Sequence, residues 1–374
     1  MESRSRSAPG HVRLRLGISR SGGAGFPHRP GAPYKAAMRR PLVLLLVLLL
    51  ALGGASFALW SWTVGRLRAG FDAWAQQAAA QGWTVRAGTT RGAGWPVAGE
   101  LVMHDLTLAA NPDVLPGGAT WTAARAVLHI SPLAPQVLEI RLQGTQRVRV
   151  LGDLSAPFES ESFVLTVPLP GPGPVHMTAH QIRFGAPVAG MSIGLLDGQL
   201  QQQPDSLGFD LSAEAMALPA PPAPQPALGR RIASATITGS FDGPWPPGTD
   251  PAARAALWQK GGGTLRVRHL AVGWGPLGVT GTASFGLDPS LQPLGTGTAR
   301  VVGYEPALSA LAAGGAITPA AAQAVRAVLA LLARTPDGGG APEVELPLDL
   351  HDGVVHVGHI PVGRMQHWDW SASR

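Results

Sequence analysis

The sequence predicts a mainly β (α+β) fold, in which one N-terminal transmembrane helix precedes an extended, curved antiparallel sheet with a few packed helices. Three observations predict it: an uncharged apolar run over residues 41–62, period-two alternation of apolar residues beyond residue 82, and abundant turn formers. Of 374 residues 45% are hydrophobic and 14% charged, so a core can be buried. The 49 glycines and 35 prolines oppose long helices and favour strands joined by many turns.

The apolar run, residues 41–62, reads PLVLLLVLLLALGGASFALWSW. At 1.5 Å per residue it extends about 33 Å, which is enough to cross the hydrocarbon layer of a membrane. We therefore predict an anchor over residues 38–62. Its marker residues are arginines before the run, leucines within it and tryptophans at the boundary beyond it: Arg39, Arg40, Leu45, Leu49, Trp60 and Trp62.

The charge distribution sets the expected orientation of this anchor. Residues 1–40 carry eight arginines and one lysine against a single acid, and only Arg66 and Arg68 follow the run closely. Because cations are retained on the cytoplasmic side, we expect the N-terminus inside and the bulk of the chain in the periplasm, held at the inner membrane. Cleavage near Ala58 as a signal peptide is the alternative.

The first 37 residues differ from the rest of the chain. They are rich in arginine, serine, glycine and proline without periodicity, which indicates a disordered leader. Met38 before Arg39 is also an ordinary start for an anchor, so an over-extended start is the alternative interpretation.

The net charge of +6 does not predict nucleic-acid binding, because it belongs to the leader. Beyond residue 40 the chain carries 20 basic and 22 acidic side chains. There are no cysteines, which excludes disulfides, thiolate metal sites and cysteine nucleophiles.

A helix over residues 63–82 should follow the anchor, because apolar residues recur there at helical spacing and Gly82 provides a stop. Beyond it, residues 279–287 and 344–350 alternate apolar and polar side chains, as in strands with one buried face. Pro347 should lie at an edge or a bulge, since it cannot donate to a ladder.

Helical patterns return near the C-terminus, where a short helix is expected over residues 305–312. A second helix should begin at Thr318 and Pro319, and its apolar stripe consists of Val325, Val328, Leu329 and Leu332. The proline-rich stretch at 217–230 reads as a semi-rigid linker between a β-rich half at 83–216 and a second at 231–374, which includes these helices.

Two motifs suggest catalysis or cofactor binding, but the secondary structure expected around each one does not suit that chemistry. Gly190 to Gly194 matches the nucleophile elbow around Ser192, but a turn between strands is expected there instead of a strand-to-helix turn. Gly273 to Gly278 fits a dinucleotide pattern, but a proline removes a backbone donor and a strand should follow. We expect no enzymatic activity and no cofactor, with a serine hydrolase as the remotest alternative.

The histidines do not predict a metal site. On a strand beyond the Asp352–Gly353 turn, His356 and His359 point to opposite faces, so they cannot share one ion.

The chain resembles an uncharacterised alphaproteobacterial family, the domain of unknown function number two-one-two-five. The resemblance covers residues 38–374 and is carried by the anchor, Gly82-Trp83-Thr84-Val85, Gly94-Trp95-Pro96, Trp274-Gly275-Pro276, His351-Asp352-Gly353-Val354 and Gly358-His359-Ile360-Pro361. The family implies an envelope protein with a periplasmic β domain and supplies no catalytic residues. The layout is also similar to AsmA-like proteins, which by analogy suggests lipid handling.

We therefore expect a lipid-binding or envelope-homeostasis protein, with a groove floored by Val279, Phe285, Val344 and Leu346. The alternative is a non-catalytic scaffold partner in the envelope. An open groove over these residues favours lipid, and a helix closed over them favours the scaffold.

Overall fold

The computed structural model describes residues 39–110, 118–150, 154–169, 171, 173–186, 188, 190–219, 227–244, 246, 250–335, 341–358, 360–365, 367–368 and 370. The predicted leader, residues 1–37, and Met38 lie outside this part of the chain. The chain divides into two compact units, residues 1–53 and residues 54–374. The first contains the N-terminal part of helix α2, and the second contains the rest of α2 and the sheet.

Helix α2 (Arg39–Ala80) joins the predicted anchor and the predicted amphipathic helix into one element of 42 residues. Its most apolar window has a mean hydropathy of 2.7 and no buried residue, so the helix is long and apolar enough to cross a membrane. The helix ends as predicted: the amide of Gly82, at φ +82°, donates to the carbonyl of Ala79.

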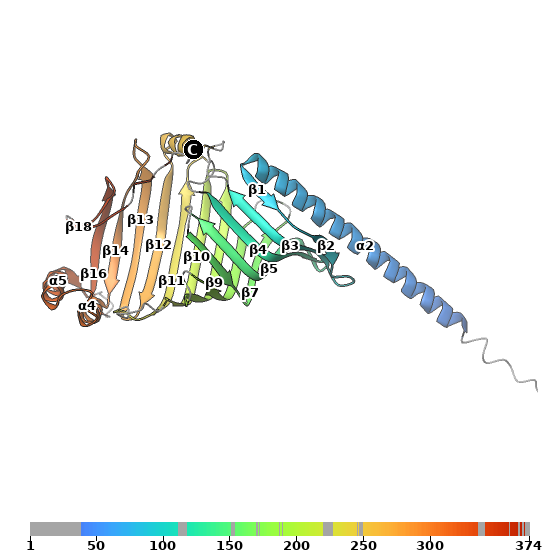
Figure 1. The fold of residues 1–374 in the computed structure, drawn as a ribbon, viewed down its shortest axis with the longest axis horizontal. Helices are drawn as coiled ribbons and strands as arrows, with labels where there is room; N and C mark the ends of the chain where they lie inside the picture. The colour runs from blue at the N-terminus through green and yellow to red at the C-terminus, as the bar shows by residue number, and fades with distance from the viewer. Residues whose placement is uncertain are drawn as a thin grey trace, which may run out of the picture. The chain divides into compact units, whose positions relative to one another are not determined.

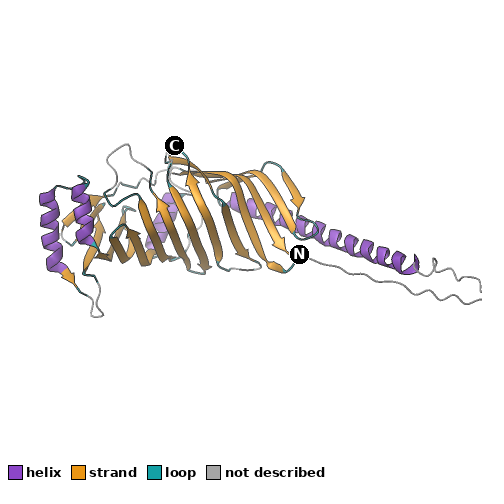
Figure 2. Ribbon diagram, turned by 90° about the horizontal axis from the view of Figure 1, so that it is seen from below, coloured by secondary structure: helices purple, strands orange, loops and turns teal. Residues whose placement is uncertain are grey.

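The rest of the second unit is dominated by one antiparallel sheet of 18 strands, which twists along its length (Figures 1 and 2). The strands of its N-terminal part are β1 (Trp83–Arg86), β2 (Thr90–Ala93), β3 (Gly99–Ala110), β4 (Ala119–Ser131), β5 (Ala134–Val150), β6 (Leu154–Glu159), β7 (Ser162–Pro168), β8 (Val175–Phe184), β9 (Ser192–Gln203) and β10 (Ser206–Ala217). The remaining strands are β11 (Arg231–Asp242), β12 (Thr264–Trp274), β13 (Leu277–Leu287), β14 (Pro293–Val302), β15 (Ala333–Arg334), β16 (Glu343–His351), β17 (Val354–Val357) and β18 (Ile360–Arg364).

The two predicted β-rich halves belong to this single sheet. Strand β10 pairs with β11 along its whole length, from Ser206 opposite Asp242 to Ala217 opposite Arg231. The proline-rich stretch therefore connects two neighbouring strands, and the hydrogen-bonded ladder continues past it.

The main core lies where α2 crosses the first strands. Leu67 is 6% exposed and belongs to a cluster with Leu101 and Met103 of β3, and Phe71 packs against the same cluster. One turn earlier, Thr63 occupies the space that a side chain at Gly99 would fill. This glycine thus allows close approach of the helix to the sheet. Leu67 and Phe71 thus hold this part of the helix against the sheet.

The described residues also form three shorter helices: α3 (Pro251–Lys260), α4 (Tyr304–Ala313) and α5 (Pro319–Leu332). Helices α4 and α5 confirm both C-terminal predictions, and the Thr318 hydroxyl caps α5 by accepting from the Ala321 amide. Tyr304 and Leu308 of α4 form a second core with Val344 of β16.

The predicted apolar stripe of α5 is only partly buried. Leu329 packs against the core formed by α4 and β16, whereas Val325, Val328 and Leu332 remain 42%, 51% and 50% exposed.

Pro347 lies in β16 at a position that has no paired residue on one side, so the expected edge position holds locally although β16 as a whole has strands on both sides. On one side β14 pairs with the whole of β16, whereas on the other side β15 pairs with its first two residues and β17 with its last four. The Pro347 carbonyl accepts from Gly358 on this second side. The missing N–H therefore falls between two short partner strands, where no ladder bond is lost.

Candidate functional site: an apolar sheet face

One face of seven consecutive strands carries only apolar side chains and glycines in three adjacent cross-strand rows, which we call the apolar face. The first row consists of Leu200, Phe209, Gly239, Val267, Ala283, Gly297 and Leu348. The second consists of Gly198, Leu211, Ile237, Leu270, Gly281, Ala299 and Leu346. The third consists of Leu196, Ala213, Ala235, Val272, Val279, Val301 and Val344.

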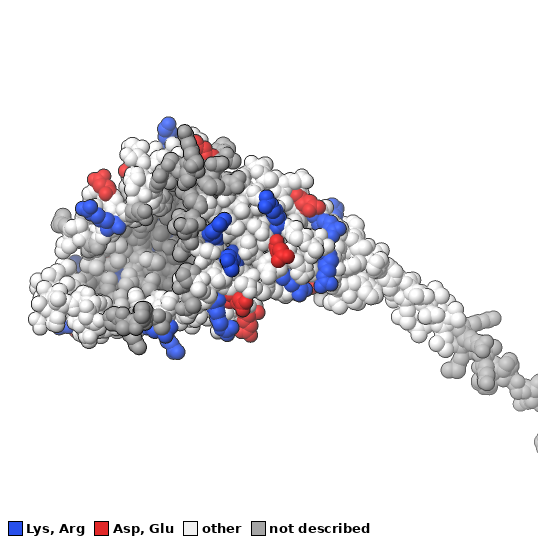
Figure 3. All heavy atoms as spheres, in the orientation of Figure 1, with Lys and Arg blue, Asp and Glu red and all other residues white. Residues whose placement is uncertain are grey.

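The opposite face of the same strands is polar. A typical row there runs Gln201, Gly208, Ser240, Arg266, Ser284, Thr296 and Asp349. Figure 3 shows lysine and arginine scattered among aspartate and glutamate over the visible surface of the described residues. A two-faced sheet of this kind normally covers its apolar side with other elements or with a ligand.

The apolar face is open over its central strands and closed at one end. Leu200, Leu211 and Leu270 are 50%, 39% and 36% exposed, although each points to the apolar side. At the far end, Val344 is completely buried under α4. Within the described residues, the open part thus extends over β9 to β12.

A cavity of about 270 Å³ adjoins the apolar face on the side nearer α2. Its lining is entirely apolar and comes from β5 to β9: Val148, Ala156, Phe158, Phe163, Ile182, Phe184, Ile193 and Leu196. Leu196 also begins the third row, so the cavity and the apolar face meet at this residue. A binding region with a deep apolar end and no charged lining residue suits a hydrocarbon chain.

Two aromatic rings lie close to glycines on or beside the apolar face. A Cβ atom at Gly239 would come within 2.6 Å of the ring of Phe209. A Cβ atom at Gly295, beside the rows on β14, would come within 2.5 Å of the ring of Phe285. These glycines therefore provide the space that the two rings occupy.

The four groove residues predicted from the sequence share this face but differ in environment. Val279 and Phe285 of β13 are half-buried and lie beside the open part. Leu346 packs against the cluster formed by α4 and α5. Val344, at 0% exposure, is a core residue in this structure and is not part of an open surface, because α4 covers it.

The sequence reasoning missed the apolar residues of β10 on this face, among them the exposed Leu211. Leu207, Phe209 and Leu211 alternate with glycine and aspartate along β10, which is the same signal that identified β13 and β16. The cavity was not predictable in this way, because its lining comes from five strands whose pairing involves two separate partners of β5.

The two motifs rejected on sequence lie in hairpins. Ser192 is the first residue of strand β9, so no helix follows it, and it pairs with Ala217 of β10. Trp274 and Leu277 pair with each other across the two-residue turn between β12 and β13. Neither arrangement provides the strand-to-helix turn on which a nucleophile elbow or a dinucleotide loop depends.

The loop between β2 and β3 lies beside the last turns of the apolar segment of α2. The Trp60 indole Nε1 donates to the Ala93 carbonyl at 2.7 Å, and the ring centroids of Phe57 and Trp95 are 6.4 Å apart. Trp95 is 51% exposed and Val97 is 77% exposed. An exposed tryptophan next to the end of a possible membrane span is typical of a polar–apolar boundary.

The helix and the sheet together define the class of protein: a large two-faced antiparallel β sheet that follows an N-terminal helix able to act as a single membrane span. Within that class, residues 60–366 match the model of a family described as an uncharacterized protein conserved in bacteria (DUF2125), and the chain belongs to this family. Comparisons with curated proteins and with solved structures found no match.

Proposed function

We propose that this is a single-pass protein of the bacterial inner membrane that binds lipid acyl chains on the apolar face of its periplasmic sheet. The observation that supports it is the set of three uncharged rows across seven strands, exposed over β9 to β12 and adjoining an apolar cavity. Monomeric proteins rarely leave apolar surface of this extent without a partner.

The dimensions of the face fit hydrocarbon chains. The four open strands, β9 to β12, lie about 4.8 Å apart and span roughly 14 Å, close to the ~15 Å that one lipid tail covers in a bilayer leaflet. Each buried methylene contributes about 0.8 kcal/mol, so a chain laid along a row binds without any polar contact. The proposed role is therefore to hold or shield lipid tails, without catalysis.

A charge placed on the apolar face should displace the lipid. We expect native mass spectrometry of the full chain, extracted from membranes in mild detergent, to show co-bound lipid. The variant Leu211→Glu should reduce that occupancy about tenfold or more, because a carboxylate would lie unpaired against the hydrocarbon.

The matched control is Ser212→Glu, since this residue is next in sequence and belongs to the polar face. It should leave lipid occupancy unchanged, with both variants checked for folding by circular dichroism. Bare protein in several mild detergents, or equal loss of lipid in the two variants, would contradict lipid binding.

A scaffold role is the second candidate, and two observations favour it. Helix α4 closes over Val344, one of the four predicted groove residues. Helix α5 presents Val325, Val328, Leu331 and Leu332 to solvent at 42–87% exposure, and an apolar helix face can dock a protein. If the chain emerges from membranes without lipid but with a stoichiometric protein, and Val328→Glu releases that protein, the scaffold replaces lipid binding.

Two cysteine variants test the location of the sheet and its distance from the bilayer, since the native chain has no cysteine. Ser290→Cys lies in the exposed turn between β13 and β14, and Val97→Cys lies beside Trp95. In spheroplasts, a membrane-impermeant maleimide should label Ser290→Cys readily. It should label Val97→Cys several-fold more slowly until detergent is added, because lipid headgroups cover that loop.

The two sites report separately on location and depth. A Ser290→Cys variant that reacts only after lysis would show that the sheet is cytoplasmic. Equal reactivity of both cysteines in intact membranes would show that the β2–β3 loop stands clear of the bilayer.

A further inference from the structure

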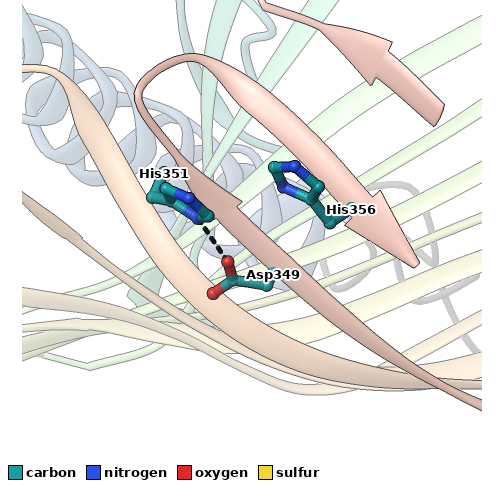
Figure 4. A group of neighbouring side chains, drawn as sticks. All are labelled: Asp349, His351 and His356. Atoms are coloured by element: carbon teal, nitrogen blue, oxygen red, sulfur yellow. Dashed lines mark hydrogen bonds and ion pairs between the residues drawn. The ribbon is translucent and has the colours of Figure 1, made fainter. Parts of the chain in front are cut away.

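Three side chains converge on the polar face at the C-terminal end of the sheet. Asp349 and His351 lie two residues apart on β16, and His356 of β17 is paired with Asp349 in the antiparallel register. The Asp352–Gly353 turn, with both residues at positive φ, fixes this register. Figure 4 shows all three side chains on the same side of the hairpin.

The distances bring one donor atom from each residue into a small volume. Their ligand atoms all lie within 4.8 Å of one another. His351 Nδ1 is 2.5 Å from Asp349 Oδ2, and the two imidazole rings stack with centroids 4.9 Å apart at 14°. Two ligands of one zinc ion lie about 3–3.5 Å apart, so small rotations of the side chains would complete the coordination.

The environment of His356 gives an independent indication. Its Nδ1 atom is shielded from solvent and has no hydrogen-bond partner among the described residues. Buried polar atoms in folded proteins nearly always have a partner, and an imidazole nitrogen without one is available as a metal ligand.

The charges around the cluster also suit a cation. The cross-strand neighbours of Asp349 are Thr296 and His356, so no basic side chain pairs with it in the register. Its only close partner of this kind among the described residues is His351, a contact that a neutral imidazole with its proton on Nδ1 can also make. A divalent ion would satisfy the carboxylate and leave both imidazoles neutral.

We propose that Asp349, His351 and His356 bind one divalent transition-metal ion of the zinc type. Two imidazoles and one carboxylate provide three ligands, so at least one coordination position stays open to water or to a ligand from outside the chain. The ion joins β16 to β17 near the end of the sheet. The site lies on the face opposite the apolar rows, so it does not depend on the lipid proposal.

The test uses the full chain in detergent, purified with an affinity tag that contains no histidine and treated with a chelator. Titration with Co²⁺ should produce a visible absorption band that saturates at one ion per chain, and Zn²⁺ should displace that band. His351→Ala and His356→Ala should each weaken Zn²⁺ binding by at least about tenfold, and Asp349→Asn should weaken it by a smaller factor.

His176→Ala is the matched control, because this exposed histidine lies on β8, far from the cluster in the sheet order. It should leave both the affinity and the stoichiometry unchanged. If the double variant of His351 and His356 binds Zn²⁺ as tightly as the native chain, or if His176→Ala weakens binding equally, surface histidines bind the metal nonspecifically and the proposal fails. Circular dichroism excludes loss of folding as the cause.

Discussion

Replacing Leu67 with aspartate should release α2 from the sheet and produce one of the largest losses of stability in this chain. Leu67 is 6% exposed and packs in the cluster that contains Leu101 and Met103. Truncation of a buried leucine to alanine costs about 2–5 kcal/mol, and an unpaired buried carboxylate costs more. The free energy of unfolding, from urea titration followed by tryptophan fluorescence, should fall by at least about 4 kcal/mol.

Gly70→Ala is the control for this experiment. It lies one turn further along the same helix, and a Cβ atom there would meet no other atom within 4 Å. Because alanine is the better helix former, this variant should be neutral or more stable by about 0.5–1 kcal/mol. If Leu67→Asp unfolds at the same urea concentration as the native chain, the helix does not depend on the sheet for its position.

Replacing Gly303 with alanine should destabilise the C-terminal helices. Gly303 precedes α4 at φ +69°, and a Cβ atom there would overlap the carbonyl oxygen of Pro276. Because this oxygen belongs to the backbone, a side-chain rotation cannot relieve the overlap. The turn between β12 and β13 or the start of α4 must therefore shift. We expect α4 to lose its packing over Val344, and the free energy of unfolding to fall by about 3 kcal/mol or more.

Gly315→Ala separates this clash from backbone strain alone. Gly315 also has a positive φ, +72°, but a Cβ atom there would meet nothing within 4 Å. The stability that Gly315→Ala loses should stay near the cost of placing alanine in the left-handed conformation, about 1–2 kcal/mol. Thermal unfolding and protease sensitivity at α4 measure both variants. Equal losses would mean that the contact with Pro276 relaxes freely.

Local patterns predicted much of this fold. The apolar run, the alternation along β13 and β16, and the Thr318–Pro319 start of α5 each depend on neighbours in sequence, which a single chain displays. The fold class and the family follow from the same patterns.

At two positions the buried apolar residues change from odd-numbered to even-numbered positions along a strand, and simple alternation in the sequence does not predict this change. Asp105 and Gln181 adopt φ +53° and +51°, and at each one the pairing omits a residue. After Asp105, the apolar side therefore continues at Leu106 instead of Asp105. The register is the same on both sides of each residue, so these changes of face depend on packing between strands, which sequence spacing alone does not record.

The three-residue cluster was within reach of sequence reasoning and was missed. A two-residue Asp-Gly turn at 352–353 places His351 opposite Val354, and hence Asp349 opposite His356. The interpretation compared only His356 with His359 and did not extend the register back to the acid. His359 itself lies outside the described residues.

The composition of the apolar face has a consequence for selectivity. Its rows present only aliphatic side chains, one phenylalanine ring and glycines to a bound tail. Shape discrimination needs contacts that a wrong partner cannot make, and none of the three rows contains a hydrogen-bonding side chain. Such a face would select lipids by their hydrophobicity and chain length, so a mixture of lipid species would bind to it.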